Sequence, residues 1–497
     1  MSKTPYKELE ERFERLSKLG QATGILQWDM ACNMPMGGAE ARAGQLSALK
    51  VLSHEILTGP ALGDFLDAAE ADRTLDDWQQ ANLEAMRRRR IRAVAVDGEL
   101  VRRLSEAGSR CEMLWREAKD QADFAMVLPA LTEVRDLVVE RAAALATALD
   151  RDPYDALLDG YEPDARAAAV APVLEDLAAF LPGFIDDVLA RQAVAGPLLP
   201  LPGPFALDAQ RRLCRSMMEV VGFDFDHGRL DESHHPFCGG VPEDIRITTR
   251  YSEDDFMPGL MGVLHETGHA LYEQGLPAEW RHQPVGKGRG MVLHESQSLM
   301  IEMQACRSAE FIAFAAPRMR KAFGGQGTAW EAANIYRHYT LVERGFIRVD
   351  ADEVTYPAHV ILRFRLERAM LAGDLPLADL PGAWNEGMKE LLGIIPPNDA
   401  LGCLQDIHWY DGAWGYFPTY TLGAMAAAQL FAAALGANPG IKEALAKGDF
   451  SQLMAWLRAN VHKKASSMST DQLLTRATGS PLGSRAFKEH LKTRYLA

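Results

Sequence analysis

The sequence predicts a mainly α-helical protein with a few short β-strands. Ala, Leu, Glu and Arg, which favour helices, are abundant among the 497 residues. The segment from Trp78 to Leu149 consists almost entirely of residues that favour helices. Only one run, Asp244–Tyr251, alternates with the period of two that is typical of a strand. A chain with 47% hydrophobic residues can bury a large core.

The N-terminal half consists of helices separated by Pro and Gly. The first is amphipathic, because Leu9, Phe13 and Leu16 share one face of the stretch 6–19. The run Asn33–Gly38 breaks the pattern before the next helix. Further helices are expected at 39–57, across 78–149, and at 165–194 with a break at Pro182-Gly183.

Four prolines between Pro197 and Pro204 indicate a stiff, extended connection. We therefore expect a soft internal boundary near 195–206, within one catalytic fold that spans 1–497. The candidate catalytic and binding residues lie beyond it, in the region 231–423. The apolar run Ala424–Ala437 is shorter than a membrane span and predicts a core helix.

Charge and cysteine usage restrict the partners and the compartment. The formal net charge of -15 argues against nucleic-acid binding, which needs a basic surface. The short basic run Arg87–Arg90 is interpreted as a solvated helix face. Six scattered cysteines without a Cys-x-x-Cys pair suit a reducing compartment. With no signal-peptide pattern at the N-terminus, we expect a cytoplasmic protein without a membrane partner.

The alternating run Asp244–Tyr251 places Ile245, Ile247 and Thr249 on one face and Arg246 on the other. Two interpretations remain open. The strand could offer a free edge that holds an extended peptide by main-chain hydrogen bonds. It could equally belong to a structural hairpin with solvated arginines.

The sequence Leu264-His265-Glu266-Thr267-Gly268-His269 contains His-Glu-x-x-His in a segment that should be helical. Positions i and i+4 lie on the same face of a helix, so His265 and His269 can bind one metal ion. Glu266, beside them, can accept a proton from the attacking water. Because the motif is short, a pair of core or solvated histidines is the alternative.

The neighbouring sequence supports a metal site. Acidic residues and Pro258 predict the start of this helix, Gly275 and Pro277 predict its end, and Leu264 and Gly268 lie on its buried face. A third ligand can come from Glu295, at the head of the next helical run. Two histidines and one glutamate leave a zinc position open for chemistry. The alternative role for Glu295 is a carboxylate that stabilises a helix start.

Two later clusters mix charged, aromatic and Gly/Pro residues, as is typical of a cleft lining. One surrounds Arg348, for which a surface ion pair with a nearby aspartate is the alternative. The other runs from Gly402 through His408 to Tyr420. Buried polar residues with satisfied hydrogen bonds are the alternative for both His408 and Tyr420.

Six short motifs in order resemble those of the carboxypeptidase Taq (M32) family of metallocarboxypeptidases. They cover about Ser233 to Tyr420, whereas the N-terminal two hundred residues resemble the family only loosely, through Trp28-Asp29. The motifs are His235-Pro236-Phe237, Asp-x-Arg-x-Thr at 244–248, His265–His269, His294–Gln297, Ile-Arg-x-x-Ala-Asp at 347–352 and Gly-x-x-Gln-Asp-x-His-Trp at 402–409.

The resemblance implies a large single helical fold with a deep active-site groove, with its few strands near the zinc helix, and a homodimer. It also implies removal of single residues from the free C-terminus of peptides, with broad specificity. The ion is expected to be one Zn²⁺ per chain, with Co²⁺ as a substitute. A helical zinc endopeptidase or oligopeptidase is the alternative; an inactive peptide-binding protein and a scaffold with chance motifs are more remote.

The predicted mechanism assigns His265, His269 and Glu295 to the metal, and Glu266 as the base that later protonates the leaving amine. His408 and Tyr420 match positions that stabilise the oxyanion in related enzymes, although Tyr416 lies close to Tyr420. An exopeptidase also needs a donor for the terminal carboxylate, for which a guanidinium is well suited. Arg348 is the first choice and Arg246 the competitor. The other substrate-binding candidates are Asp244 and His235.

Overall fold

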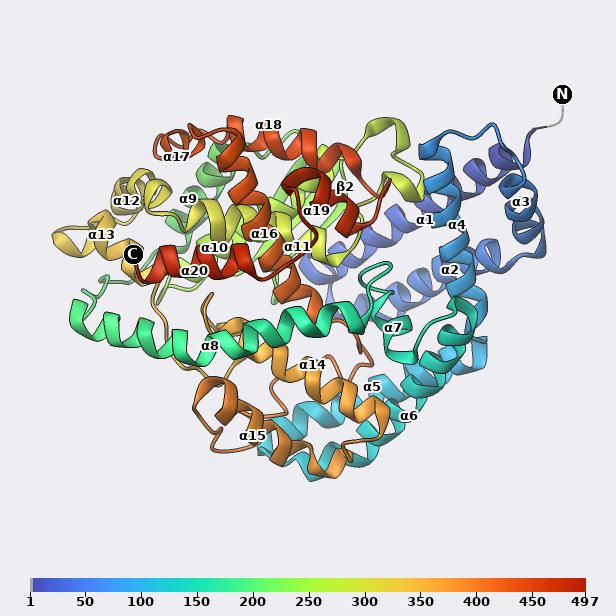
Figure 1. Cartoon of the computed structure of the whole chain (residues 1–497), viewed down its shortest axis with the longest axis horizontal. Helices are drawn as coiled ribbons and strands as arrows, with labels where there is room; N and C mark the ends of the chain where they lie inside the picture. The colour runs from blue at the N-terminus through green and yellow to red at the C-terminus, as the bar shows by residue number, and fades with distance from the viewer. Residues whose placement is uncertain (1–2) are drawn as a thin grey trace. The chain divides into compact units, whose positions relative to one another are not determined.

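The structure is a computed structural model that describes residues 3–497 (Figure 1). It confirms the mainly helical class: helices account for 69% of the chain, and the described residues contain three short strands. The chain folds as two compact units, each assembled from three separate stretches. Unit 1 takes the described residues up to Ala93, with Leu198–Tyr339 and Ala426–Leu482. Unit 2 takes Val94–Pro197, Thr340–Met425 and Gly483–Ala497, so one crossing lies in the proline-rich connection.

Unit 1 holds the N-terminal helices, the sheet and the helices that carry the metal motif. Its helices are α1 (Pro5–Cys32), α2 (Ala39–Thr58), α3 (Pro60–Glu70), α4 (Asp77–Ala95, ending just across the boundary), α9 (Leu207–Val221), α10 (Met257–Gly275), α11 (Met291–Leu299), α12 (Ala309–Ala322), α13 (Ala332–Tyr339), α17 (Ile441–Leu445), α18 (Ser451–Asn460) and α19 (Thr470–Thr478).

The N-terminal helices pack on one apolar cluster. Leu9, Phe13 and Leu16 of α1 are buried together with side chains of α3 and α4, as the predicted amphipathic pattern requires. The helix is longer than expected, because it continues through Trp28 to Cys32. The predicted break follows it, with a short 3₁₀ turn at Met36–Gly38.

The basic run on α4 remains partly exposed to solvent, and two of its arginines also have partners within the unit. Arg87 pairs with Asp67 and Glu70 of α3. Arg90 donates to the carbonyls of Leu57 and Gly59 at the end of α2. The guanidinium of Arg89 lies 5.5 Å from the ring centre of Phe13, although the residue itself is exposed to solvent. Arg87 and Arg90 are therefore held by neighbouring helices, whereas Arg89 is exposed as the sequence predicts.

The three strands form one small sheet in the order β1 (Gly228–Glu232), β3 (Asp244–Thr249), β2 (Phe237–Val241). Strand β3 pairs in parallel with β1 and antiparallel with β2. The predicted strand is therefore correct, but the suggestion that it offers a free edge is wrong, because β3 is the central strand. Its Ile245 and Ile247 are buried, and β3 packs against α10.

Unit 2 consists of helices and their connections. They are α5 (Gly98–Gln121), α6 (Phe124–Leu149), α7 (Pro153–Leu158), α8 (Ala167–Ala195), α14 (Tyr356–Ala372), α15 (Leu380–Leu392) and α20 (Arg485–Tyr495), while α16 (Pro418–Ala437) begins here and continues into unit 1. Helices α5 and α6 form a hairpin whose arms pack along each other (Figure 1).

The predicted break at Pro182 is wrong, because α8 runs unbroken from Ala167 to Ala195. A proline inside a helix removes one backbone hydrogen bond and crowds the preceding turn. Here Leu181, Phe184 and Ile185 on either side of Pro182 are all buried. Burial of this continuous apolar face outweighs the local cost of the proline.

Two helices, α8 and α16, are long and apolar enough by length and composition to cross a membrane. The apolar run that was expected to begin at Ala424 is part of a longer helix, since α16 begins at Pro418. Within the protein, 39% of the most apolar window of α8 and 61% of that of α16 are buried. Core helices of globular proteins pass the same test, so this is weak support for a span.

Candidate active site

Helix α10 carries the metal motif and begins and ends as the sequence predicts. The Asp255 carboxylate accepts a hydrogen bond from the backbone N–H of Met257, and Pro258 occupies the first turn. The helix ends at Gly275. Its faces at Leu264 and Gly268 are buried, which holds His265 and His269 in a fixed direction.

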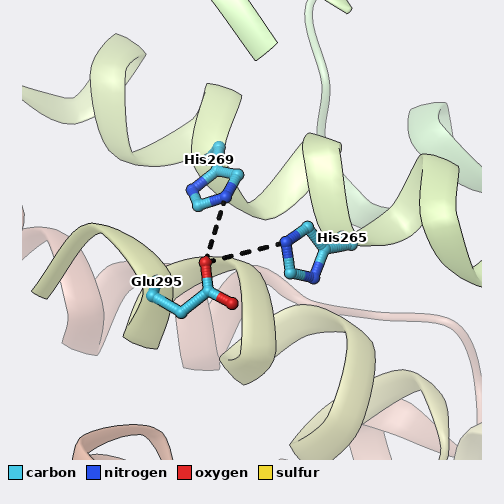
Figure 2. Close-up of side chains that lie close together, drawn as sticks. All are labelled: His265, His269 and Glu295. Atoms are coloured by element: carbon cyan, nitrogen blue, oxygen red, sulfur yellow. Dashed lines mark ion pairs between the residues drawn. The ribbon is translucent and has the colours of Figure 1, made fainter. Parts of the chain in front are cut away.

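His265 and His269 of α10 and Glu295 of α11 point toward one another (Figure 2). Their candidate ligand atoms all lie within 4.8 Å of one another. Glu295 Oε2 is 3.8 Å from His265 Nε2 and 3.6 Å from His269 Nε2. The structure thus brings together the three residues predicted as metal ligands.

Gly268 allows this meeting of the two helices. A Cβ at this position would lie 2.5 Å from the carbonyl oxygen of Gln297 and 2.6 Å from Cα of Ser298. Both atoms belong to the backbone of α11. The absence of a side chain at Gly268 therefore lets α11 approach α10 closely enough for Glu295 to face the two histidines.

A carboxylate absent from the sequence prediction orients His265. Glu302 Oε2 lies 2.9 Å from His265 Nδ1, and Arg307 donates to Glu302 Oε1 at 2.6 Å. Glu302 lies in a π-helical segment, Met300–Cys306, that directly follows α11. Its pKa is lowered: burial opposes ionisation, but the charge of Arg307 and the bond from His265 outweigh it. An ionised Glu302 keeps the proton of His265 on Nδ1 and directs the Nε2 lone pair toward the ligand cluster.

A second chain of polar groups orients His269. Its Nδ1 lies 2.7 Å from Nδ1 of His294, whose Nε2 is 3.0 Å from Glu273 Oε1. If His269 offers Nε2 to a metal, its Nδ1–H donates to His294, and His294 in turn donates to Glu273. Burial opposes ionisation of Glu273, but its bond with His294 lowers the pKa of this carboxyl. In this arrangement His294 is a hydrogen-bond partner of His269 and not one of the three metal ligands.

The residues present fit a divalent transition-metal ion. Tetrahedral zinc with nitrogen and oxygen ligands at 2.0–2.1 Å holds those ligands about 3.3 Å apart. The separations of 3.6 and 3.8 Å differ from this by a few tenths of an ångström. Burial opposes protonation of His265, yet Glu295 and Glu302 raise its pKa to about 10. The carboxyl groups of Glu295 and Glu302 thus favour a positive charge at His265.

Glu266 lies next to His265 on α10 and is 8% exposed. Loss of solvation raises the pKa of this carboxyl to about 7, and the charges of Glu295 and Glu302 act in the same direction. A carboxylate whose pKa lies near neutrality is suited to accept a proton and release it again.

The Asp-x-Arg-x-Thr motif lies on one face of β3 in unit 1. Arg246 makes a two-point ion pair with Asp244, at 2.6 and 2.8 Å, and its guanidinium lies 4.3 Å from the ring centre of Trp28. Thr248 Oγ1 accepts from the backbone N–H of Phe237. The side chain of His235 is exposed, and its carbonyl accepts from Ser233.

Arg348 lies in unit 2 and is 4% exposed, so the alternative of a surface ion pair is wrong and its ion pair is a buried one. Its Nε and Nη2 donate to Asp406, and its Nη1 donates to the hydroxyl of Tyr356 at 2.7 Å. Arg363, fully buried, donates to the same carboxylate at 2.6 Å. Gln405 Oε1 accepts from the backbone N–H of Arg348 and from Arg363 Nη2.

His408 and Tyr420 belong to an aromatic group beside Arg348 in unit 2. The ring of Tyr420 lies 5.1 Å from the Arg348 guanidinium, and both His408 and Tyr420 contact Tyr416. His408 Nδ1 is buried without a hydrogen-bond partner. Burial lowers the pKa of His408 to about 4, so its ring is neutral near pH 7.

Several residues of these networks escaped the sequence analysis. Glu302 follows Glu295 by seven residues, which is two helical turns, so the spacing could have indicated it. Gln405 and Asp406 lie within the motif at 402–409, but their partner Arg363 lies in a helical segment that contains no motif. Nothing in the sequence of that segment distinguishes Arg363 from the solvated arginines around it.

The fold and the metal-ligand cluster define a helical metal-dependent hydrolase. Residues 8–495 match the model of the carboxypeptidase Taq (M32) metallopeptidase family. Thermostable carboxypeptidase 1 of Thermus thermophilus is 37% identical, over 99% of this chain and 98% of its own length. Carboxypeptidase 1 of Bacillus subtilis is 32% identical, over 98% of this chain and 97% of its own length.

Solved structures agree with the sequence comparisons. Metallocarboxypeptidase 1 of Trypanosoma cruzi has a TM-score of 0.97 and 39% identity, covering 99% of each chain. The M32 carboxypeptidase of Deinococcus radiodurans has a TM-score of 0.93 and 36% identity, covering 99% of this chain and 98% of its own. The chain belongs to the carboxypeptidase Taq (M32) family. It is a metallocarboxypeptidase with a metal cofactor and peptide substrates.

Proposed function

We propose that this enzyme removes single residues from the free C-terminus of peptides, with broad side-chain tolerance. The proposed ion is one Zn²⁺ per chain, held by His265, His269 and Glu295, with Co²⁺ as a substitute. The observation that carries the proposal is the cluster of these three side chains. Membership of the family favours this activity over that of a helical zinc endopeptidase.

A bound zinc ion supplies Lewis acidity, which polarises the scissile carbonyl and acidifies a water molecule. Glu266 is the proposed base. It takes the proton of the attacking water and later delivers it to the leaving amine. Its burial and its pKa of about 7 support both transfers.

His408 and Tyr420 are proposed to stabilise the oxyanion of the tetrahedral intermediate. A neutral imidazole can present one N–H, and a phenol one O–H, to a developing negative charge. The depressed pKa of His408 supports its neutral form. Tyr416 competes with Tyr420 for this role, because both rings contact His408.

Arg348 is the proposed donor to the terminal carboxylate of the substrate, with Arg246 as the competitor. The bonds of Arg348 to Asp406 and Tyr356 use three of the five N–H donors that a guanidinium offers. Asp244 and His235 are the further substrate-binding candidates, Asp244 through its pair with Arg246.

The test of the activity is a time course with a short peptide, its products followed by mass spectrometry. We expect a ladder that loses one C-terminal residue at a time, abolished by a chelator and restored by Zn²⁺. Internal cleavage, or equal cleavage of the C-terminally amidated peptide, would support the endopeptidase. Elemental analysis should give one zinc ion per chain, and His265→Ala or Glu295→Ala should lower that content.

The carboxylate assignment is tested by Arg348→Ala and Arg348→Lys on free and amidated peptides. Charge-assisted hydrogen bonds contribute about 1.5–3 kcal/mol each, so Arg348→Ala should lower kcat/KM for the free acid by about tenfold to a hundredfold or more. The amidated peptide, already a poor substrate, should be nearly insensitive. Arg348→Lys keeps the charge but loses the fork, and should raise KM. Equal losses on both peptides would transfer the assignment to Arg246.

The family resemblance also supports a homodimer, and the six scattered cysteines support a reducing compartment such as the cytoplasm. Light scattering of the intact protein after size-exclusion chromatography measures the mass of the assembly. A mass of one chain over a range of concentrations would contradict the dimer.

A further inference from the structure

Two arginines in unit 2 share a single counter-charge. The guanidinium groups of Arg348 and Arg363 both donate to Asp406. The side chain of Arg363 is fully buried, and those of Arg348 and Asp406 are 5% and 10% exposed. Two positive groups and one negative group leave this cluster with one positive charge in excess.

The neighbouring side chains do not cancel that charge. His359 is fully buried, and burial lowers its pKa to about 3, with the charge of Arg363 acting in the same direction. His408 is neutral for the same reason. The other groups around the two guanidiniums are Gln405, the hydroxyl of Tyr356 and aromatic rings, and a phenol ordinarily ionises only near pH 10.

The charged groups of the cluster are fully ionised. Burial opposes ionisation of Asp406, but Arg363 and Arg348 hold the pKa of its carboxyl well below the ordinary value. Burial lowers the pKa of Arg363 to about 10, which still leaves it charged near pH 7. A buried charge in excess is costly unless a counter-charge arrives.

We propose that Arg363 is a positioning residue for carboxylate recognition, because its charge cancels that of Asp406 and leaves the charge of Arg348 for the substrate. Arg363 has no contact with solvent, and its Nε, Nη1 and Nη2 already donate to Asp406, the backbone carbonyl of His359 and Gln405. It therefore acts through Asp406 and not by touching the peptide. This inference rests on the proposed role of Arg348.

The arrangement solves a conflict between orientation and affinity. A carboxylate such as Asp406 is needed to fix the fork of Arg348, yet a one-to-one pair would neutralise the arginine that must attract an anion. Sharing Asp406 between two arginines keeps the orientation and retains a net positive charge. Gln405 adds no charge: its Oε1 accepts from the backbone N–H of Arg348 and from the guanidinium of Arg363.

The test measures the ratio of kcat/KM for a free-acid peptide to that for its C-terminal amide. Arg363→Gln should lower this ratio on the order of tenfold to a hundredfold, as expected for one charge at an effective dielectric of about 20. The loss should lie mainly in KM. Arg363→Lys keeps the charge and should retain most of the ratio. Similar ratios for Arg363→Gln and Arg363→Lys would overturn the proposal.

A double variant, Arg363→Gln with Asp406→Asn, provides the second arm. It removes both charges together and leaves that of Arg348, so the ratio should recover to within about threefold of the native value. A merely structural role predicts that the double variant is no better than the single one. Because the double variant also removes the charge of Asp406, recovery of the ratio shows that the loss in Arg363→Gln is due to charge.

Arg365→Gln is the matched control. Arg365 lies two residues from Arg363 on the same helix, but pairs with Glu175 and Glu390 and is partly exposed. Its replacement should leave the ratio unchanged. If Arg348→Ala lowers the activity on acid and amide equally, the assignment of Arg348 fails. If Arg348→Ala discriminates but the Arg363 variants do not, the inference about Arg363 alone fails.

Discussion

Replacing Gly268 by alanine should weaken metal binding without touching a ligand. The added Cβ would lie 2.5 Å from the carbonyl oxygen of Gln297, whereas ordinary contact begins at 3.4 Å. The opposing atoms belong to backbone, so no side chain can rotate away. Helix α11 must therefore retreat from α10 by about 0.9 Å at this point.

That retreat carries Glu295 away from the two histidines. Metal–ligand distances tolerate deviations of about 0.2 Å, so a shift of this size must be offset by rearrangement elsewhere. We expect the zinc dissociation constant to rise by about tenfold to a hundredfold, the range observed when groups that support metal ligands are lost. Overpacking should also cost about 1–3 kcal/mol of stability.

The matched control is Gly262→Ala on the same helix, where nothing lies within 4 Å of the added Cβ. Alanine favours helix over glycine by about 1 kcal/mol, so this variant should be as stable as the native enzyme or more so. Both apo proteins are titrated with Zn²⁺ against a chromophoric chelator. If Gly268→Ala bound zinc as tightly as Gly262→Ala, the close approach of the helices would not be what positions Glu295.

Three further predictions concern neighbouring groups. Glu266→Gln should retain one metal ion per chain while kcat falls about 10²–10⁴-fold; a native turnover rate would contradict the proton transfer. Glu302→Gln should weaken zinc binding about tenfold to a hundredfold with ligands intact, measured by chelator competition. His462 is fully buried, and burial lowers its pKa to about 3. The folded state then binds fewer protons than the unfolded state between pH 6.5 and 3, so stability falls as the pH drops through that window. At pH 5 this amounts to about 2 kcal/mol, and His462→Gln should flatten the decline of the unfolding midpoint between pH 7 and 5.

Local sequence periodicity predicted those parts of the site whose structure depends on residues close together in the sequence. The i, i+4 spacing of His265 and His269 follows from helix geometry alone, and the end of α10 follows from Gly275. The alternation of Ile245 and Ile247 predicted β3. Its central position in the sheet could not be predicted, because β1 and β2 show no comparable alternation.

Long-range packing explains the remaining differences. The interior of α8 accepts Pro182 because buried side chains lie on both sides of it. Glu302 reaches His265 from a π-helical segment; its spacing from Glu295 could have indicated the residue, but no residue pattern predicts the change of helical pitch. The two units draw on three separate stretches each, and such an arrangement depends on contacts between residues far apart in the sequence.

The contrast between Arg246 and Arg348 shows why a motif alone cannot choose between two candidate arginines. Both lie in short motifs, and both make a two-point contact with an aspartate. Asp244 belongs to Arg246 alone among the ion pairs of the described residues, and the two form a neutral pair beside Trp28. Asp406 is divided between Arg348 and Arg363, and only that cluster has a charge to offer an anion. The electrostatic difference arises from a residue outside every motif, and it favours Arg348 as the proposed receptor for the terminal carboxylate.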